Sequence, residues 1–252
     1  MDLTDEQLDR YARHIVLRDV GGAGQVKILQ AKVLVIGAGG LGSPCLQYLA
    51  AAGVGTLGIV DDDRVDLSNL QRQVLHGTPD LGRLKTESAA DAIARINPDV
   101  KVVAHTVRLT AENAEAIIAG YDMVADGSDS FETRFAVADA CLRLRKPLIS
   151  AAVGPFEGQV AVFKGYEETL PCYRCFVPES PGGQQRTCAD VGVLGALTGV
   201  IGSLQALEVL REIVGFGQSL AGRLLIYDGL SNRMRTLSLP KDPGCPACRG
   251  RE

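Results

Sequence analysis

The sequence of 252 residues lacks the features that mark several classes of protein. Basic residues are not in excess, because 26 Lys and Arg stand against 30 Asp and Glu for a net charge of −4. This balance argues against nonspecific nucleic-acid binding, which needs a basic surface. Residues 1–6 are acidic and polar and lack the basic and then apolar layout of a signal peptide. The histidines, His14, His76 and His105, have no spacing typical of a catalytic triad or a metal site.

Long apolar runs are also scarce, and residues 191–207 are the segment that tests this point. They read VGVLGALTGVIGSLQAL, which is at the short limit for a membrane span. Polar residues interrupt this run and Glu208 follows it, so we expect a buried helix over 191–214 and no membrane association. Glycines at spacings of three and four allow close backbone packing in a core or a subunit contact: Gly192, Gly195, Gly199 and Gly202.

The composition that is present is that of an ordinary globular protein. Hydrophobic residues make up 46% and charged residues 22% of the chain, which is enough to bury a full core in one large domain or two small ones. Because no signal peptide is recognisable, we expect a cytoplasmic protein whose seven cysteines are reduced thiols or metal ligands and not disulfides.

Four of these cysteines form two tight pairs, Cys172-Tyr173-Arg174-Cys175 and Cys245-Pro246-Ala247-Cys248. Two C-x-x-C pairs supply four thiolates, the number that a tetrahedral zinc ion takes in a structural site. The pairs lie far apart in the chain, and a cross-link that closes so long a loop gains most in theory. We therefore predict one structural Zn²⁺ per chain; the alternative is two unrelated redox or loop pairs.

Short apolar runs alternate with helical patterns through the first 152 residues. We expect an amphipathic helix over 3–18, which Gly21-Gly22-Ala23-Gly24 breaks. Strands are then expected at 32–36, 57–60, 100–104, 123–125 and 147–152, and helices at 41–52, 84–96, 111–119 and 134–143. After residue 152, strands at 158–163, 223–227 and 234–239 indicate antiparallel pairs. The pattern predicts an α/β fold, a doubly wound, Rossmann-like, mostly parallel sheet with an antiparallel C-terminal extension.

A glycine-rich loop follows the expected strand 32–36 at once and leads into a helix. It reads Gly37-Ala38-Gly39-Gly40-Leu41-Gly42, the G-x-G-x-x-G pattern that lets backbone approach a phosphate at a helix N-terminus. Asp61, the first of three aspartates after the next strand, is placed to hold a ribose hydroxyl. Taken alone, the pattern predicts an adenine-nucleotide site such as that of an NAD-dependent oxidoreductase.

Charged and amide side chains further along the chain point away from hydride transfer. Ser68-Asn69-Leu70-Gln71-Arg72-Gln73 follows the aspartates, and Lys85 opens the next helix. Arg72 and Lys85 are suited to brace a triphosphate, and Asp129, after the strand at 123–125, is suited to hold Mg²⁺. Each charge alone is more often a solvated surface residue, but all follow the ends of successive strands, where such sheets bind ligands.

These motifs together resemble the MoeB/ThiF family, adenylyltransferases related to the ubiquitin-activating enzymes, with the molybdopterin-synthase adenylyltransferases as the nearest type. The resemblance runs from Arg10 to Cys248. It rests on GAGGLG (37–42), VDDDRVDLSNLQRQ (60–73), Lys85, GSDS (127–130), EGQ (157–159), PCYRC (171–175), CADVGVLG (188–195), GSLQALE (202–208) and GCPAC (244–248).

The resemblance implies that the C-terminal Gly-Gly carboxylate of a ubiquitin-like sulfur carrier protein attacks the α-phosphate of ATP and releases pyrophosphate. The pathway it favours is molybdopterin (molybdenum cofactor) biosynthesis, and the thiamine-pathway carrier is the alternative. Asp61 would hold the ribose, Asp129 would bind Mg²⁺, and Arg13 would reach the site of the neighbouring subunit in a homodimer. The implied nucleotide contacts are Gly37, Gly39, Gly40, Gly42, Asp61, Ser68, Asn69, Leu70, Gln71, Arg72, Lys85, Asp129 and Ser130.

Two positions need separate comment. Many relatives have Asp-Asn where this chain has Asp129-Ser130, so we expect a tuned site, with an inactive binding module as a further alternative. Cys188 is a position at which some relatives form a thioester or acyl disulfide, and Arg186 is placed to lower its pKa. The adenylation step itself does not need this thiol.

Cys45 and Cys141 fall within expected helices and are expected to be buried.

The expected domain organisation is a single domain over 1–252. It would comprise an N-terminal helical segment (1–30), a nucleotide-binding half (31–152) and a carrier-binding half with the zinc site (153–252).

Overall fold

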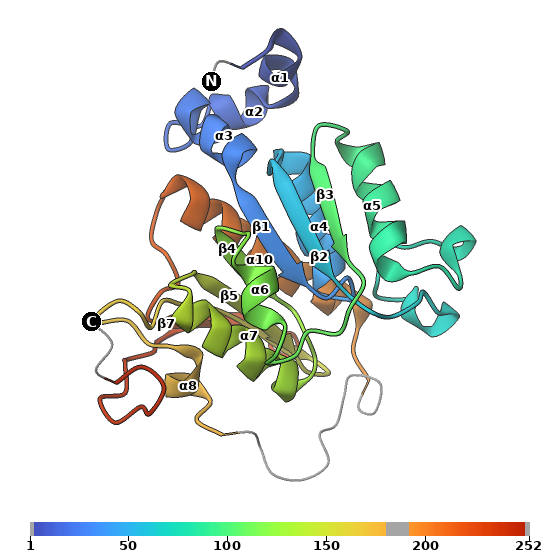
Figure 1. Ribbon diagram of the computed structural model, residues 1–252. Coiled ribbons are helices and arrows are strands. Elements are labelled where there is room, and N and C mark those ends of the chain that lie inside the picture. Colours follow the sequence, from blue (N-terminus) through green and yellow to red (C-terminus); the bar gives the residue numbers. More distant parts are fainter. Residues whose placement is uncertain (1–2, 180–191, 250–252) are drawn as a thin grey trace.

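Figure 1 shows a computed structural model, which describes residues 3–179 and 192–249. Its centre is one eight-stranded sheet in the order β3-β2-β1-β4-β5-β6-β7-β8. The parallel part comprises β1 (Lys32–Ile36), β2 (Thr56–Val60), β3 (Lys101–His105), β4 (Met123–Asp126) and β5 (Leu148–Val153). The antiparallel part comprises β6 (Glu157–Phe163), β7 (Arg223–Asp228) and β8 (Arg233–Ser238). The predicted fold class is confirmed.

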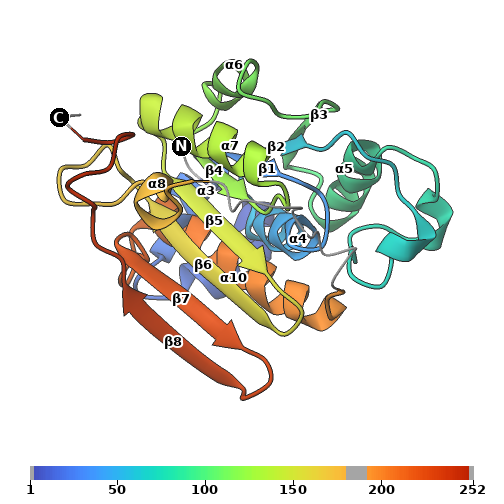
Figure 2. The same cartoon turned by 90° about the horizontal axis from the view of Figure 1, so that it is seen from below.

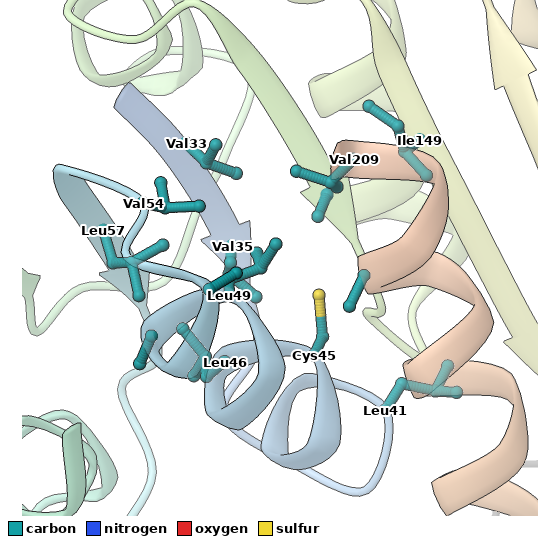
Figure 3. Packing of buried hydrophobic residues seen from close by; sticks show 14 of the residues in the cluster. Val33, Val35, Leu41, Cys45, Leu46, Leu49, Val54, Leu57, Ile149 and Val209 are labelled. Atoms are coloured by element: carbon teal, nitrogen blue, oxygen red, sulfur yellow. The ribbon is translucent and has the colours of Figure 1, made fainter. Parts of the chain in front are cut away.

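Helices cover both faces of the central parallel strands, which explains why β1, β2 and β4 are mostly buried and largely apolar, whereas the edge strand β3 is partly exposed. On one face, Val33 and Val35 of β1 pack with α4 (Gly42–Ala52), α5 (Lys85–Ile96) and α10 (Gly195–Val214). Figure 3 shows these two valines beside the side chains of α4 and α10. On the other face, Leu34 and Ile36 pack with α6 (Ala114–Ile118) and α7 (Phe131–Arg143). The remaining helical elements are α1 (Asp5–Arg10), α2 (Ala12–Ile15), α3 (Gly21–Gln30), η1 (Leu67–Asn69), η2 (Thr78–Asp80) and α8 (Tyr173–Phe176).

Two expectations for the N-terminus are wrong. The single helix over 3–18 is interrupted at Tyr11 and ends at Ile15, and the glycines of 21–24 begin α3 where they were expected only to break a helix. Tyr11 is buried and its hydroxyl accepts a hydrogen bond from Asn97 at 2.8 Å, so a tertiary contact overrides the local helical pattern. The backbone of Gly21 has φ +58°, a conformation that glycine adopts without strain.

Other boundaries differ by a few residues. The helix expected over 111–119 is the shorter α6, while α7 begins at Phe131 and not at residue 134. Its earlier start follows from Ser130, whose side chain accepts the Thr133 N–H and caps the helix. β3 begins and ends one residue later than expected.

The apolar segment near residue 200 is the predicted buried helix, α10, but it begins at Gly195 and not at residue 191. Gly192 therefore precedes the helix and does not share its face, and Val191 lies outside the described residues. In the parts of the chain that the structure describes, no helix has the length and apolar character to cross a membrane. The glycines of this segment do not act alike. A Cβ at Gly202 would lie 2.3 Å from the Leu41 carbonyl oxygen, so this glycine permits the contact between α10 and α4, whereas a Cβ at Gly199 would meet nothing within 4 Å.

The antiparallel strands form the far edge of the sheet. Figure 2 shows β7 and β8 as a hairpin that projects beyond α10. All six residues of β8 are exposed, so one edge and much of both faces of this hairpin are open to solvent.

The two glycines give a matched pair of variants. We expect Gly202→Ala to lower the free energy of unfolding by about 1–3 kcal/mol or more, because the new methyl group meets backbone that cannot rotate away. Gly199→Ala adds the same methyl group to open space and should be neutral or raise stability by up to about 1 kcal/mol. Denaturant titration of both variants checks this, and equal effects would contradict the packing described for Gly202.

Candidate functional site

A cavity of about 570 Å³ opens at the carboxyl ends of β1, β2 and β4. This is the place where the strand order turns from β2 on one side of β1 to β4 on the other, the usual ligand crevice of such sheets. The predicted site residues that line it are Gly37, Gly39, Gly40, Asp61, Asn69, Arg72, Lys85, Asp129 and Ser130. Gly42, Ser68, Leu70, Gln71 and Arg13 are not among its lining residues.

The glycine loop has a closely packed turn. Gly37 has φ +88°, and a Cβ at Gly42 would lie 1.8 Å from the Gly37 carbonyl oxygen. Gly42 therefore closes the turn at the start of α4, and this packing explains the third glycine of the motif without a ligand contact. Gly40 faces Thr198 of α10, whose side chain would lie 3.1 Å from a Cβ there.

Ala38, inside this loop, is held through both of its backbone polar groups. Its N–H donates to Asp61 Oδ2 at 2.8 Å, and its carbonyl accepts from His76 Nε2 at 2.9 Å. His76 Nδ1 lies 2.8 Å from Ser88 Oγ, and burial lowers the pKa of His76, so the neutral imidazole is the stable form. Because the carbonyl only accepts, Nε2 carries the proton. The trans peptide then turns the Gly39 N–H away from His76.

Asp61 thus has a structural contact that its sequence position does not reveal. Its second oxygen accepts the Asp63 N–H at 2.9 Å. Burial raises the pKa of Asp61, and the charge of Lys85 opposes that rise. The contact of Asp61 with a ribose stays a prediction. The hydrogen bond from the Ala38 N–H shows that Asp61 also holds the glycine loop.

Lys85 and Arg72 bring positive charge to the cavity. Lys85 Nζ lies 2.7 Å from Asp63 Oδ2, and the lysine side chain is 6% exposed while that of Asp63 is 67% exposed. Arg72 donates through Nη1 to the Ser68 carbonyl at 3.0 Å. Ser68 itself donates to Asp66 at 2.6 Å, so it shapes this turn and does not enter the cavity.

The second loop of the site carries Asp129 and Ser130. Asp129 is exposed at the cavity, and Ser130 caps α7 through Thr133. Serine and asparagine are both good capping residues, so the departure from Asp-Asn preserves the start of this helix. Carboxylate oxygens of Asp61, Asp62 and Asp63 lie within 4.8 Å of one another at the same cavity. These hard oxygen donors fit Mg²⁺.

Sequence reasoning missed several residues of the cavity. Gln73 and Ser128 line it, and among the described residues the Gln73 Oε1 and Ser128 Oγ atoms are buried without a hydrogen-bond partner. Buried polar atoms of this kind are commonly satisfied by a ligand or by water. Arg134 also lines the cavity from α7. Its place, one turn into the helix after the Asp129 loop, was the only signal for it in the sequence.

The four predicted metal ligands come together where the segment around α8 meets the C-terminal loop. Cys172 Sγ lies 3.8 Å from that of Cys175 and 3.7 Å from that of Cys245, and the sulfurs of Cys175 and Cys248 are 3.5 Å apart. A tetrahedral site with Zn–S bonds of about 2.3 Å has edges of about 3.8 Å. Three of the thiols are buried and the fourth is partly buried, so the donor set fits a structural Zn²⁺.

The remaining sequence predictions concern Arg13 and the cysteines outside the cluster. Cys45 and Cys141 are buried in α4 and α7, as expected, and burial raises the pKa of Cys45 to about 12. Arg13 is exposed on α2, which Figure 1 places at the end of the sheet opposite the cavity. Cys188 and its neighbour Arg186 lie outside the described ranges 3–179 and 192–249.

Comparison with known proteins decides the family. A family model described as "ThiF family" matches residues 11–247. The chain belongs to the ThiF family. A sulfur carrier protein adenylyltransferase of Thermus thermophilus is 49% identical, over 98% of this chain and 93% of that protein. The SAMP-activating enzyme E1 of Haloferax volcanii is 45% identical, over 98% of this chain and 91% of that protein.

A longer relative is the adenylyltransferase and sulfurtransferase MOCS3 of Drosophila yakuba, which is 47% identical over 98% of this chain but only 54% of its own length. These findings confirm the resemblance to the MoeB/ThiF family and the enzyme class, an adenylyltransferase. A crystal structure of E. coli MccB superposes with a TM-score of 0.86 at 21% identity, over 99% of this chain and 74% of that one, which confirms the fold of this ThiF-family chain.

For the cysteine cluster we expect about one zinc per chain in metal analysis of protein kept reduced. Cys245→Ser should lower the zinc content and reduce the free energy of unfolding by more than about 3 kcal/mol, because metal binding and folding are coupled. Cys45→Ser is the control: it disturbs a buried thiol outside the cluster and should keep the zinc. Absence of zinc from the reduced wild-type protein would refute the assignment.

Proposed function

We propose that this ThiF-family enzyme uses ATP to adenylylate the C-terminal Gly-Gly carboxylate of a ubiquitin-like sulfur carrier protein and releases pyrophosphate. The observation that carries the proposal is the cavity at the ends of β1, β2 and β4. It combines a glycine loop with two cations, Arg72 and Lys85, and with the carboxylate of Asp129. The sulfur carrier protein adenylyltransferase of Thermus thermophilus, similar over nearly its whole length, supports the choice of substrate.

The chemistry requires charge compensation more than it requires a protein nucleophile. The attacking carboxylate and the triphosphate are both anions, so cations around the α-phosphate lower the barrier. Lys85 is already desolvated and held by Asp63, which fixes the direction of its ammonium group before substrate binds. Arg72 is held through the Ser68 carbonyl, and Asn69 lines the same cavity. These residues would contact the triphosphate.

Asp129 would hold Mg²⁺, with the carboxylates of 61–63 as further oxygen donors at the same cavity. The ion, when bound, would neutralise charge on the phosphates. Asp61 would also contact the ribose, and the Gly39 N–H, turned away from His76, would face the phosphates. The Cys188 thiol is not needed for this reaction, because the acyl-adenylate forms without it.

We propose that residues 31–152 bind the nucleotide and residues 153–252 bind the carrier. Phe156, Leu230 and Met234 are exposed apolar side chains of the second half that would offer the carrier a contact surface. The position of Arg13 at the opposite end of the sheet agrees with a role in the site of a second subunit, so we propose a homodimer.

The pathway is proposed as molybdopterin biosynthesis, with the thiamine-pathway carrier as the alternative. The EGQ motif at 157–159 and the tail around Asp242-Pro243-Gly244-Cys245 favour the first. The segment Ile226-Tyr227-Asp228-Gly229 is compatible with the second.

ATP–pyrophosphate exchange tests the reaction directly. We expect exchange when the protein is mixed with an intact molybdopterin-type carrier, because only an attacking carboxylate makes the adenylate. The thiamine-type carrier and both carriers without their last glycine are the controls. Exchange with the thiamine-type carrier alone would change the pathway, and binding of a carrier without any exchange would support the inactive binding module.

Lys85→Ala should reduce the exchange rate about a hundredfold or more, since it removes a desolvated cation from the triphosphate site. Lys101→Ala is the matched control, because Lys101 is an exposed lysine at the start of β3 and does not line the cavity. Equal rates for the two variants would contradict the proposed role of Lys85 and would favour the oxidoreductase interpretation of the glycine loop.

A further inference from the structure

Arg134 is a buried guanidinium behind the Asp129 loop for which the proposed reaction gives no direct task. Only 7% of the residue is exposed. Its Nη2 donates to the Ser128 carbonyl and, at 2.8 Å, to the Ala151 carbonyl, while Nη1 donates to Ser150 Oγ at 3.3 Å. The guanidinium therefore ties the loop after β4 to the end of β5.

Ser128, the residue that Arg134 holds, is fixed on its other side as well. Its N–H donates to Asp126 Oδ1 at 2.9 Å, and Asp126 is 1% exposed. A buried carboxylate thus binds the N–H of Ser128 and a buried guanidinium binds its carbonyl. Hydrogen bonds to charged groups are stronger than neutral ones, so this one residue is held more firmly than an ordinary loop residue.

The next residue in the chain is Asp129, whose carboxylate is exposed at the cavity. Fixing both peptide groups of Ser128 limits the directions in which Asp129 can point. Both hydrogens of Arg134 Nη2 are already committed to protein carbonyls, so this part of the guanidinium is not available to a phosphate. Through Nη2, Arg134 therefore acts on the loop.

We propose that Arg134, together with Asp126, is a positioning residue that presents Asp129 to the divalent cation of the nucleotide site. This inference rests on the proposed function for the identity of the ligand, MgATP. Arg134 is proposed to strengthen only the part of the nucleotide affinity that depends on Mg²⁺. Backbone that is held before the ligand arrives loses less freedom on binding.

The test compares the Kd of a non-hydrolysable ATP analogue in Mg²⁺ with its Kd in EDTA, by calorimetry. The ratio of the Kd in EDTA to the Kd in Mg²⁺ measures how much the ion strengthens binding. We expect Arg134→Gln to reduce this ratio by about tenfold or more, toward the ratio of Asp129→Ala. The Kd in EDTA should change much less. Arg143→Gln is the matched control, because Arg143 lies on the same helix and pairs with Glu115 outside the cavity.

A second readout needs no ligand. Hydrogen exchange of the amides of 127–131 should be faster in Arg134→Gln than in the wild type, and unchanged in Arg143→Gln. If Arg134→Gln does not fold, Arg134→Lys and Asp126→Asn replace it; each keeps part of the hydrogen bonding and should lower the ratio by a smaller factor.

Equal weakening in Mg²⁺ and in EDTA would overturn the proposal, because it would show a merely structural arginine. A wild-type ratio of one would overturn it too, since there would be no magnesium-dependent binding to lose. Failure of the proposed function is distinguishable: the protein would then bind the analogue with a ratio that depends on Arg134 but would exchange no pyrophosphate with any carrier.

Discussion

The proposed nucleotide site depends on backbone that is held by buried charged and polar side chains. Ala38 and Ser128 are each bound at the N–H by an aspartate and at the carbonyl by a nitrogen donor, His76 in one case and Arg134 in the other. The two loops follow β1 and β4, the strands on either side of the point where the strand order turns. The sheet alone brings these loops close together, and the side-chain bonds then fix their conformation.

The same arrangement explains how a cavity rich in charge can stay ordered. Cations and carboxylates at the cavity are mostly engaged with protein groups: Lys85 with Asp63, and Arg72 with the Ser68 carbonyl. Pre-arranged dipoles and charges of this kind need little reorganisation when a reacting anion binds. The ion pair with Asp63, whose carboxylate stays in contact with water, offsets part of the cost of desolvating Lys85.

Sequence patterns predicted the features that are local and periodic. The alternation of strands and helices gave the sheet, and the spacing within each cysteine pair gave a ligand set that the fold then completes. The interruption at Tyr11 could not be predicted, because it depends on a hydrogen bond with Asn97, 86 residues away. The partners of His76 and Arg134 lie on other elements, so both residues have ordinary surroundings in the sequence. Gly42 fits its motif, but its packing against Gly37 appears only in the structure.

Helix α10 contacts the glycine loop and the end of β4, just before the Asp129 loop. Thr198 lies against Gly40 and donates to the Arg72 carbonyl at 3.4 Å, and Gln205 Nε2 donates at 3.0 Å to the carbonyl of Asp126 and at 2.9 Å to that of Ile149. A single helix thus packs against the glycine loop near its start and supports β4 and β5 in its middle. The exposed side of α10 includes Val200 and Leu207, so a partner bound there would contact the same helix that packs against Gly40 of the glycine loop.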